Sequence, residues 1–291
     1  MLDPVTIDGV TIERAWITPR DTARVHLLPA FKAPICVVIV RRTSKRFHIL
    51  KWDLRTNKLM PGSWFTGTIY SKRCDVSWDG QWMVYLALGA DANKSWNGLC
   101  RPPWLKTMLH SPNSGTWAGG GVFTTERRLE ANTHWHAESD LSQIGSPPSG
   151  IRITRLDSGG EDFPVLFKRL ERDGWIRNGK HYGDEIELKS LKHTYANAYI
   201  NDDGWVCQPT RKHPPLLMWY RGYLERGYTF EFRIESHPEL LRTAEWACWS
   251  SGGDLLVADD GHLSRYKLGD LKTGEPSFST DLNALTPPAS S

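Results

Sequence analysis

The stretch Asp-Leu-Leu-Val-Ala-Asp-Asp-Gly-His-Leu-Ser-Arg-Tyr-Lys-Leu (residues 254–268) predicts a strand, a tight turn and a second strand. Asp260-Gly261 stands at its centre, and such a pair suits a type I′ turn, in which both central residues have positive φ. Residues 74–88 predict a similar hairpin around Asp79-Gly80. Further Asp-Gly and Asn-Gly pairs occur at residues 8–9, 97–98, 173–174, 178–179 and 203–204. The chain is therefore expected to be built from antiparallel hairpins.

Helical patterns are short and few. Ser236 and Glu239 have the spacing of a capping box, which predicts a helix from Ser236 to about Thr243. A weaker helical pattern runs from Trp104 to His110. Neither segment is long enough to cover a sheet, so parallel α/β folds are disfavoured and an all-β fold is expected.

The composition predicts one soluble domain, residues 1–291, with a short C-terminal tail from Thr280. Similar hairpins flank the Pro/Ser-rich loop at residues 139–150, so that loop is not a domain linker. The net charge of +3 is too small to require a polyanionic partner. We expect no membrane association and a cytoplasmic location, because the first residues lack the pattern of a signal peptide and no apolar run could span a bilayer.

The cysteines are odd in number, far apart in the chain and set among apolar residues. They are Cys36, Cys74, Cys100, Cys207 and Cys248. Without a Cys-x-x-Cys pair, they are expected to be buried free thiols.

Two short sequence patterns, called phrases below, recur along the chain. Residues 49–59 and 263–275 each place an aromatic residue in a strand before a Thr-containing polar turn. A Ser- or Asp-rich turn with Gly precedes a strand at residues 77–82, 111–117, 201–205 and 249–255. With these phrases the chain resembles the WD40-like β-propeller superfamily over about residues 35–275, although the Gly-His element of WD40 blades is missing. The resemblance implies an irregular β-propeller of about five, and up to six, blades of about 40–45 residues. A β-sandwich or mixed β fold remains the alternative.

Motifs for chemistry are incomplete. His134, His136 and Glu138 share one face of a predicted strand and are weak candidates for a metal site, but zinc usually needs a fourth ligand and none is visible. Gly119-Gly120-Gly121 leads into a strand and lacks the Lys-Ser/Thr of a phosphate-binding loop, so a close backbone approach is expected there. We expect no metal, no cofactor and no catalytic residue, and a binding protein rather than an enzyme.

The candidate binding surfaces are a loop at residues 146–150 and a stretch of basic and aromatic residues. The second comprises Arg211, Lys212, Trp219, Tyr220 and Arg221. Residues 41–48 are also basic and aromatic, but they are predicted to form a solvated hairpin turn. Arginine and aromatic side chains on loops commonly carry protein recognition.

The function that this reading favours is a non-catalytic platform that binds another protein, as a scaffold or regulatory subunit of a cytosolic complex. A carbohydrate-active propeller, either a lectin or a glycoside hydrolase, is the first alternative, because the chain has 14 tryptophans. Nucleic-acid binding is the second alternative and is not favoured. Tryptophan rings exposed at one mouth of the fold would favour a sugar ligand, and buried rings would favour a scaffold.

Overall fold

The computed structural model describes part of the chain. The described residues are 5–7, 10–12, 22–91, 94–113, 115–132, 144–156, 160–178, 198–200, 204–223 and 227–287. Strands dominate these segments, and nearly all of the strand pairs are antiparallel. The prediction of a β-rich fold is therefore confirmed.

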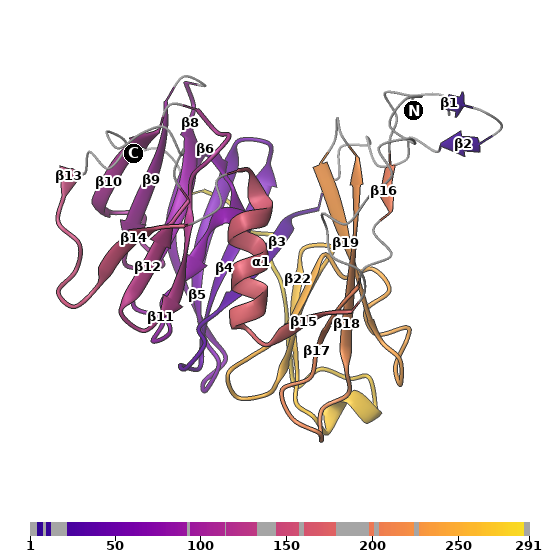
Figure 1. Ribbon diagram of the computed structural model, residues 1–291. Coiled ribbons are helices and arrows are strands. Elements are labelled where there is room, and N and C mark those ends of the chain that lie inside the picture. Colours follow the sequence, from indigo (N-terminus) through magenta and orange to yellow (C-terminus); the bar gives the residue numbers. More distant parts are fainter. Residues whose placement is uncertain are drawn as a thin grey trace.

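A nine-stranded sheet forms the N-terminal half of the structure (Figure 1). Its strands are β3 (Arg24–Pro29), β4 (Ile35–Thr43), β5 (Arg46–Asp53), β6 (Lys58–Ile69), β7 (Asp75–Val76), β8 (Met83–Gly89), β9 (Ser95–Cys100), β10 (Thr107–Asn113) and β13 (Ile144–Gly145). The long strand β6 pairs with β5 up to Thr66 and with β8 from Gly67 onward, so it joins two meanders.

Three smaller sheets and a separate hairpin contain the remaining strands. The three-stranded sheet holds β11 (Gly121–Thr125), β12 (Arg128–Ala131) and β14 (Arg152–Arg155), and β12 and β14 are parallel. The five-stranded sheet holds β15 (Trp175–Asn178), β16 (Ala198–Ile200), β17 (Gly204–Cys207), β18 (Leu216–Tyr223) and β19 (Gly227–Ile234). The four-stranded sheet, the last along the chain, holds β20 (Trp246–Trp249), β21 (Leu255–Asp259), β22 (His262–Tyr266) and β23 (Phe278–Asp281). The hairpin consists of β1 (Val5–Ile7) and β2 (Val10–Ile12).

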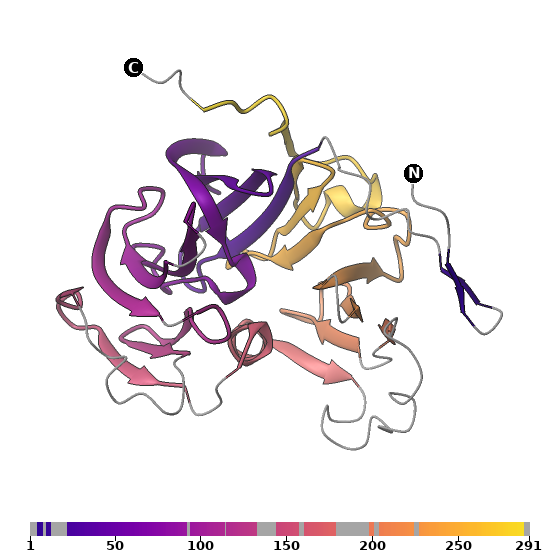
Figure 2. The same cartoon turned by 90° about the horizontal axis from the view of Figure 1, so that it is seen from above.

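The sheets stand around a common centre in a propeller-like arrangement (Figure 2). The first and last sheets meet, because β3 packs against β20 and β21. The single α-helix of the described segments, α1 (Asp162–Arg172), lies between β11 and β15 and contacts both strands. Two short 3-10 helices, η2 (Ser71–Arg73) and η5 (Asp270–Lys272), lie in connections between strands. Most of the largest hydrophobic cluster lies where α1, the nine-stranded sheet, the five-stranded sheet and the four-stranded sheet face one another.

The hairpin at residues 254–268 forms as predicted. Strands β21 and β22 pair from Leu255–Tyr266 to Asp259–His262, and Asp260 and Gly261 both have positive φ. Residues 75–84 also form an antiparallel pair, but the turn is longer than two residues and is held by the Ser77 hydroxyl, which accepts from the Gln81 and Trp82 amides.

Two of the Asp-Gly and Asn-Gly pairs found in the sequence are not hairpin turns. Asn97 and Gly98 lie inside β9, where a Cβ on Gly98 would overlap the ring of Tyr85. Asp173 is the C-cap of α1, and Gly174 follows it with a φ of +87°. This glycine ends a helix, which is the other common use of a left-handed residue.

Both predicted helices are wrong. Residues 235–243 form successive turns, in which an N–H donates a hydrogen bond to the carbonyl three residues earlier, as Leu240 does to His237. Pro238 therefore does not begin a helix. The segment from Trp104 leads into strand β10, which begins at Thr107.

The expectations for the cysteines, for the hairpin turn within residues 41–48 and for the glycines are confirmed. All five cysteines are buried and free. Residues 43–46 form the turn between β4 and β5. A Cβ on Gly120, whose φ is +81°, would overlap the carbonyl of Arg73, so the glycines there do permit a close backbone approach. No helix in the described segments is both long and apolar enough to cross a bilayer.

Candidate functional site

An open groove of about 650 Å³ lies between the five-stranded sheet, β15–β19, and the four-stranded sheet, β20–β23. Three connections form its walls: the turn from β17 to β18, the segment after β19, and the connection from β22 to β23. The lining residues are Gln208, Arg211, Lys212, His213, Pro214, Pro215, Ser236, His237, Leu268, Gly269, Leu271 and Lys272. Its volume lies within the range of small-ligand sites, and its openness to solvent also suits an extended polymer segment.

His213 fixes the wall that the turn from β17 to β18 provides. Its Nε2 lies 3.0 Å from the carbonyl oxygen of Gly253, which can only accept, so Nε2 carries the proton. Nδ1 then accepts from the hydroxyl of Thr210 at 2.8 Å. The ring packs edge-on against Trp249, and the side chain of Gln208 donates to the His213 carbonyl at 2.7 Å. The turn is thereby attached to the last sheet, and the groove has a rigid wall.

The charges on the groove are all of one sign. Arg211 and Lys212 are exposed on the turn, and Lys272 is exposed on the opposite connection. None of these three side chains forms an ion pair with the described part of the chain, and no described acidic residue lines the groove. Asp270, beside Lys272, instead accepts from the backbone amide of Lys267 at 2.7 Å. Such a concave surface carries a positive potential that attracts anionic groups.

The predicted binding residues divide into two groups. The structure brings Arg211 and Lys212 to the groove. Trp219 is half-buried, lies outside the groove lining and packs across Gly204. Tyr220 and Arg221 belong to β18, but their side chains lie outside the described residues. The loop at residues 146–150 is largely exposed and also lies away from the groove.

Sequence reasoning missed the other wall of the groove. Lys272, His237 and Leu268 come from connections 25 or more positions further along the chain, and nothing in the sequence places them beside Arg211. The signal that was available was local: Pro214 and Pro215 end the basic turn and fix its shape.

The metal candidates His134, His136 and Glu138 lie outside the described residues. Among the residues that are described, no three His, Cys, Asp or Glu side chains gather in a way that could hold a metal ion.

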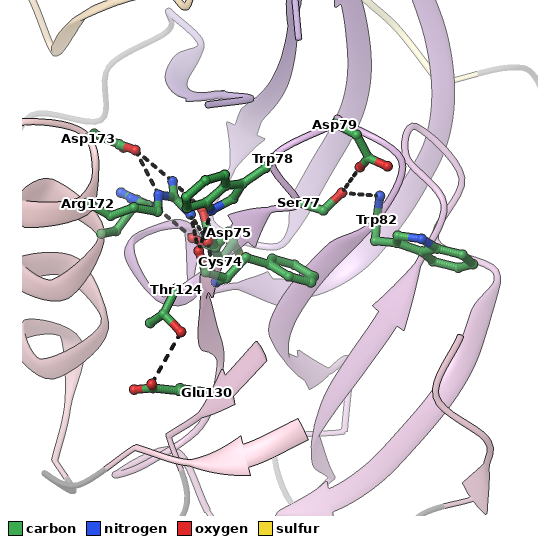
Figure 3. A network of polar contacts seen from close by, with 12 residues as sticks. Cys74, Asp75, Ser77, Trp78, Asp79, Trp82, Thr124, Glu130, Arg172 and Asp173 are labelled. Carbon is green, nitrogen blue, oxygen red and sulfur yellow. Dashed lines mark hydrogen bonds and ion pairs between the residues drawn. The ribbon is translucent and has the colours of Figure 1, made fainter. Parts of the chain in front are cut away.

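A second concentration of charge lies inside the molecule, where α1 meets the strands (Figure 3). Arg172 donates to both carboxylate oxygens of Asp75, at 2.5 and 3.1 Å, and its Nε donates to Asp173 at 2.9 Å. Asp75 also accepts from the Phe123 amide at 2.7 Å. Burial raises the pKa of Asp173, and the neighbouring Arg172 acts in the opposite direction. Each charge thus has partners within the protein, as a structural network requires.

The same helix places Arg169 deeper in the interior. Its guanidinium donates to the Cys74 carbonyl and lies 3.1 Å from Nε2 of His26. Burial, with the nearby Arg169 charge, lowers the pKa of His26 well below its usual value, so this ring is neutral and accepts from the arginine. The network therefore holds α1 against strands β3 and β7.

The interior network does not form a reaction site. The cavity beside Arg169 and Asp173 is about 20 Å³, which is room for about one water molecule. Cys207 and Cys248 also line it, but burial raises the pKa of both thiols, so neither is a ready nucleophile. The open groove is consequently the candidate site.

Most of the described tryptophans are buried or partly buried. Trp16 and Trp135 lie outside the described residues. Five are buried, namely Trp52, Trp175, Trp205, Trp246 and Trp249. Only Trp104, at 54% exposure, and Trp117, at 60%, are exposed among those described, and neither lines the groove. No exposed tryptophan ring of the described chain therefore offers a stacking surface at the groove.

Comparisons with known proteins add little. No protein-family model and no curated protein matches the chain. Among solved structures, the chain is similar to the β-propeller domain of the Trilobed protease from Pyrococcus furiosus, a domain described as having an open velcro topology. The identity is 10% and the TM-score 0.30, over 86% of this chain and 82% of that one.

Proposed function

We propose that this domain is a non-catalytic platform that binds another protein in the groove between its five-stranded and four-stranded sheets. The observation that carries the proposal is the groove itself, an open volume of about 650 Å³ on which Arg211, Lys212 and Lys272 are unpaired within the described chain. Surface cations that serve only solubility do not need a rigid concave wall, whereas recognition gains from one because less order is lost on binding.

The proposed platform is a β-propeller of five blades. The bend of β6 divides the nine-stranded sheet into two blades, and the other three sheets supply one blade each. Strand β20 would be the inner strand of the last blade, facing β3 of the first. We further propose that the platform acts within a cytosolic complex, as a scaffold or regulatory subunit.

Site-specific photo-crosslinking tests the proposed function. Gly269 lines the groove, has a φ of −68° and has nothing within 4 Å of an added Cβ, so benzoylphenylalanine fits there. Lys45, exposed on the turn between β4 and β5, is the control position. In cells that naturally make the protein, we expect a polypeptide adduct from position 269 that is lost when Arg211→Ala and Lys212→Ala are added.

The same experiment can overturn the proposal. A nucleic-acid or glycan adduct at position 269 would replace the protein partner by one of the alternative ligands. An adduct that forms equally from position 45, or that persists without Arg211 and Lys212, would show that the groove is not the binding surface.

A further inference from the structure

The groove combines two kinds of surface. Its charged rim consists of Arg211 and Lys212 on one wall and Lys272 on the other. The lining also includes apolar groups, chiefly Pro214, Leu268 and the buried Leu271. A ligand that fits both kinds of surface carries anionic groups together with an apolar group.

The lining argues against a nucleic-acid strand. Single-stranded nucleic acids are held by aromatic rings on which bases stack, together with cations that follow the backbone. The groove is lined by no Trp, Tyr or Phe from the described chain. Its imidazole His213 has both ring nitrogens engaged and one edge against Trp249. Prolines and leucines instead suit an aliphatic side chain.

The walls also come from different sheets. His213 joins the turn from β17 to β18 to the carbonyl of Gly253, in the turn from β20 to β21. The wall that carries Arg211 and Lys212 is therefore attached, before any ligand arrives, to the sheet whose β22–β23 connection carries Lys272. Such preorganisation favours ligands whose charges have a matching spacing.

We infer that the partner presents a short acidic segment in which an apolar residue is flanked by aspartates or glutamates. The apolar side chain lies over Pro214 and Leu268, and the flanking carboxylates face Arg211 and Lys212 on one side and Lys272 on the other. This inference rests on the proposed function and specifies the chemistry of the protein that the groove binds.

Fluorescence anisotropy with synthetic peptides tests the inference. The probe is a fluorescein-labelled Gly-Asp-Asp-Leu-Asp-Asp-Gly peptide at low salt. The comparison peptides carry Asn in place of every Asp, or Ser in place of Leu, and a short oligothymidylate serves as a competitor. We expect saturable binding of the probe, loss of binding with the Asn peptide and several-fold weaker binding with the Ser peptide.

Variants of the protein locate the binding. Arg211→Ala with Lys212→Ala should weaken the probe about fivefold or more, and Lys272→Ala a few-fold, because an exposed ion pair contributes up to about a factor of five. Lys45→Ala with Arg46→Ala removes two equally exposed cations from another turn and should leave the affinity unchanged. A circular dichroism spectrum and thermal midpoint equal to those of the wild type establish that each variant is folded.

The outcomes separate this inference from the proposed function. If position 269 crosslinks to a polypeptide but the acidic probe does not bind, or binds the control variant and the groove variant equally, the inference is wrong and the protein-binding role remains. If oligothymidylate displaces the probe more effectively than unlabelled peptide does, the groove recognises nucleic acid and both proposals fail.

Discussion

Arg172 and Asp75 lie 97 positions apart in the chain and form a two-point ion pair inside the molecule. The arginine side chain is 6% exposed and the aspartate 1%. This contact ties α1 to β7 and determines how the helix sits between β11 and β15. Its role is structural because every charge has a partner and no cavity large enough for a substrate adjoins it.

Arg172→Met should therefore destabilise the fold strongly. It leaves the buried carboxylate of Asp75 with one fewer cation, and breaking such a pair costs about 3–5 kcal/mol. Urea denaturation followed by tryptophan fluorescence measures the change. Arg242→Met is the matched control, because Arg242 pairs with Glu239 only at 3.5 Å and both side chains are more than three-quarters exposed. Equal stability of the two variants would refute the structural role of the Arg172 pair.

The first and last sheets are joined by side chains, since no strand described in the structure is shared between them. Arg265 of β22 donates to the Leu54 carbonyl and to Asn57 at 2.9 Å, while Asp254 holds its guanidinium. Arg265 and Leu54 belong to the two sequence phrases at residues 263–275 and 49–59, so equivalent segments of the first and last sheets meet here.

Arg265→Met should weaken this contact between the first and last sheets. Hydrogen bonds that involve a charged group contribute about 1.5–3 kcal/mol, so we expect a loss of stability of about that size. Hydrogen exchange should rise first in β3 and β20, where the two sheets face each other. Arg55→Met, which removes a 72% exposed arginine from the neighbouring turn, should change neither quantity.

The sequence predicted what local rules determine. The turn at Asp260-Gly261 formed because only residues that tolerate positive φ can close a two-residue hairpin. Helix α1 was missed although Val165, Leu166 and Leu170 have helical spacing. Arg169 is buried on the same face, and the burial of an arginine depends on its partners. The partners that make this burial possible, Asp75 among them, are distant in sequence.

The same limit applied to the groove. The stretch from Arg211 was recognised as basic and exposed from its own residues. The opposite wall of the groove and its apolar lining residues depend on how two sheets face each other, which one sequence does not reveal. The helix expected at Ser236 failed for a related reason. Leu241 and Ala244 are buried between the sheets, and that packing is satisfied by successive turns.

Stability should fall in alkali because all five thiols are buried. Burial raises the pKa of each thiol above the 9.0 of an exposed cysteine, to about 12 for Cys74 and Cys207. Above pH 9 the unfolded chain loses these protons while the folded chain keeps them. The folded state then binds more protons, so the free energy of unfolding decreases as pH rises.

The slope of that decrease is the quantity to measure. Each thiol contributes up to about 1.4 kcal/mol per pH unit between pH 9 and its folded pKa. Cys207→Ala should reduce the slope by about one such contribution, whatever the cost of the small cavity it leaves. In parallel, denatured protein without reductant should yield five alkylated thiols, and a smaller number would indicate disulfides.

Lys72 should produce the opposite trend at lower pH. Burial, the largest cause, lowers its pKa from 10.5 to about 7; Asp162 opposes this and Arg24 reinforces it. Between these values the unfolded chain holds a proton on Lys72 that the folded chain does not hold. The free energy of unfolding therefore rises with pH from about 7 upward. Lys72→Met should remove this rise between pH 7 and 8.5, before the thiols begin to ionise, and an unchanged slope would contradict it.

Gly253→Ala tests whether the geometry of the groove, apart from its charge, matters for binding. Gly253 has a φ of +81°, and a Cβ there would lie 2.6 Å from Nε2 of His213, the atom that attaches the basic turn from β17 to β18 to the turn from β20 to β21. The substitution should displace His213 and weaken the acidic peptide probe several-fold, although every cation of the groove remains. Gly274→Ala is the matched control, because Gly274 has a similar φ of +72° and nothing within 4 Å of an added Cβ. Both variants should lose about 1–2 kcal/mol of stability from backbone strain. Only Gly253→Ala should also lose peptide affinity, so equal affinities in the two folded variants would show that charge alone governs recognition.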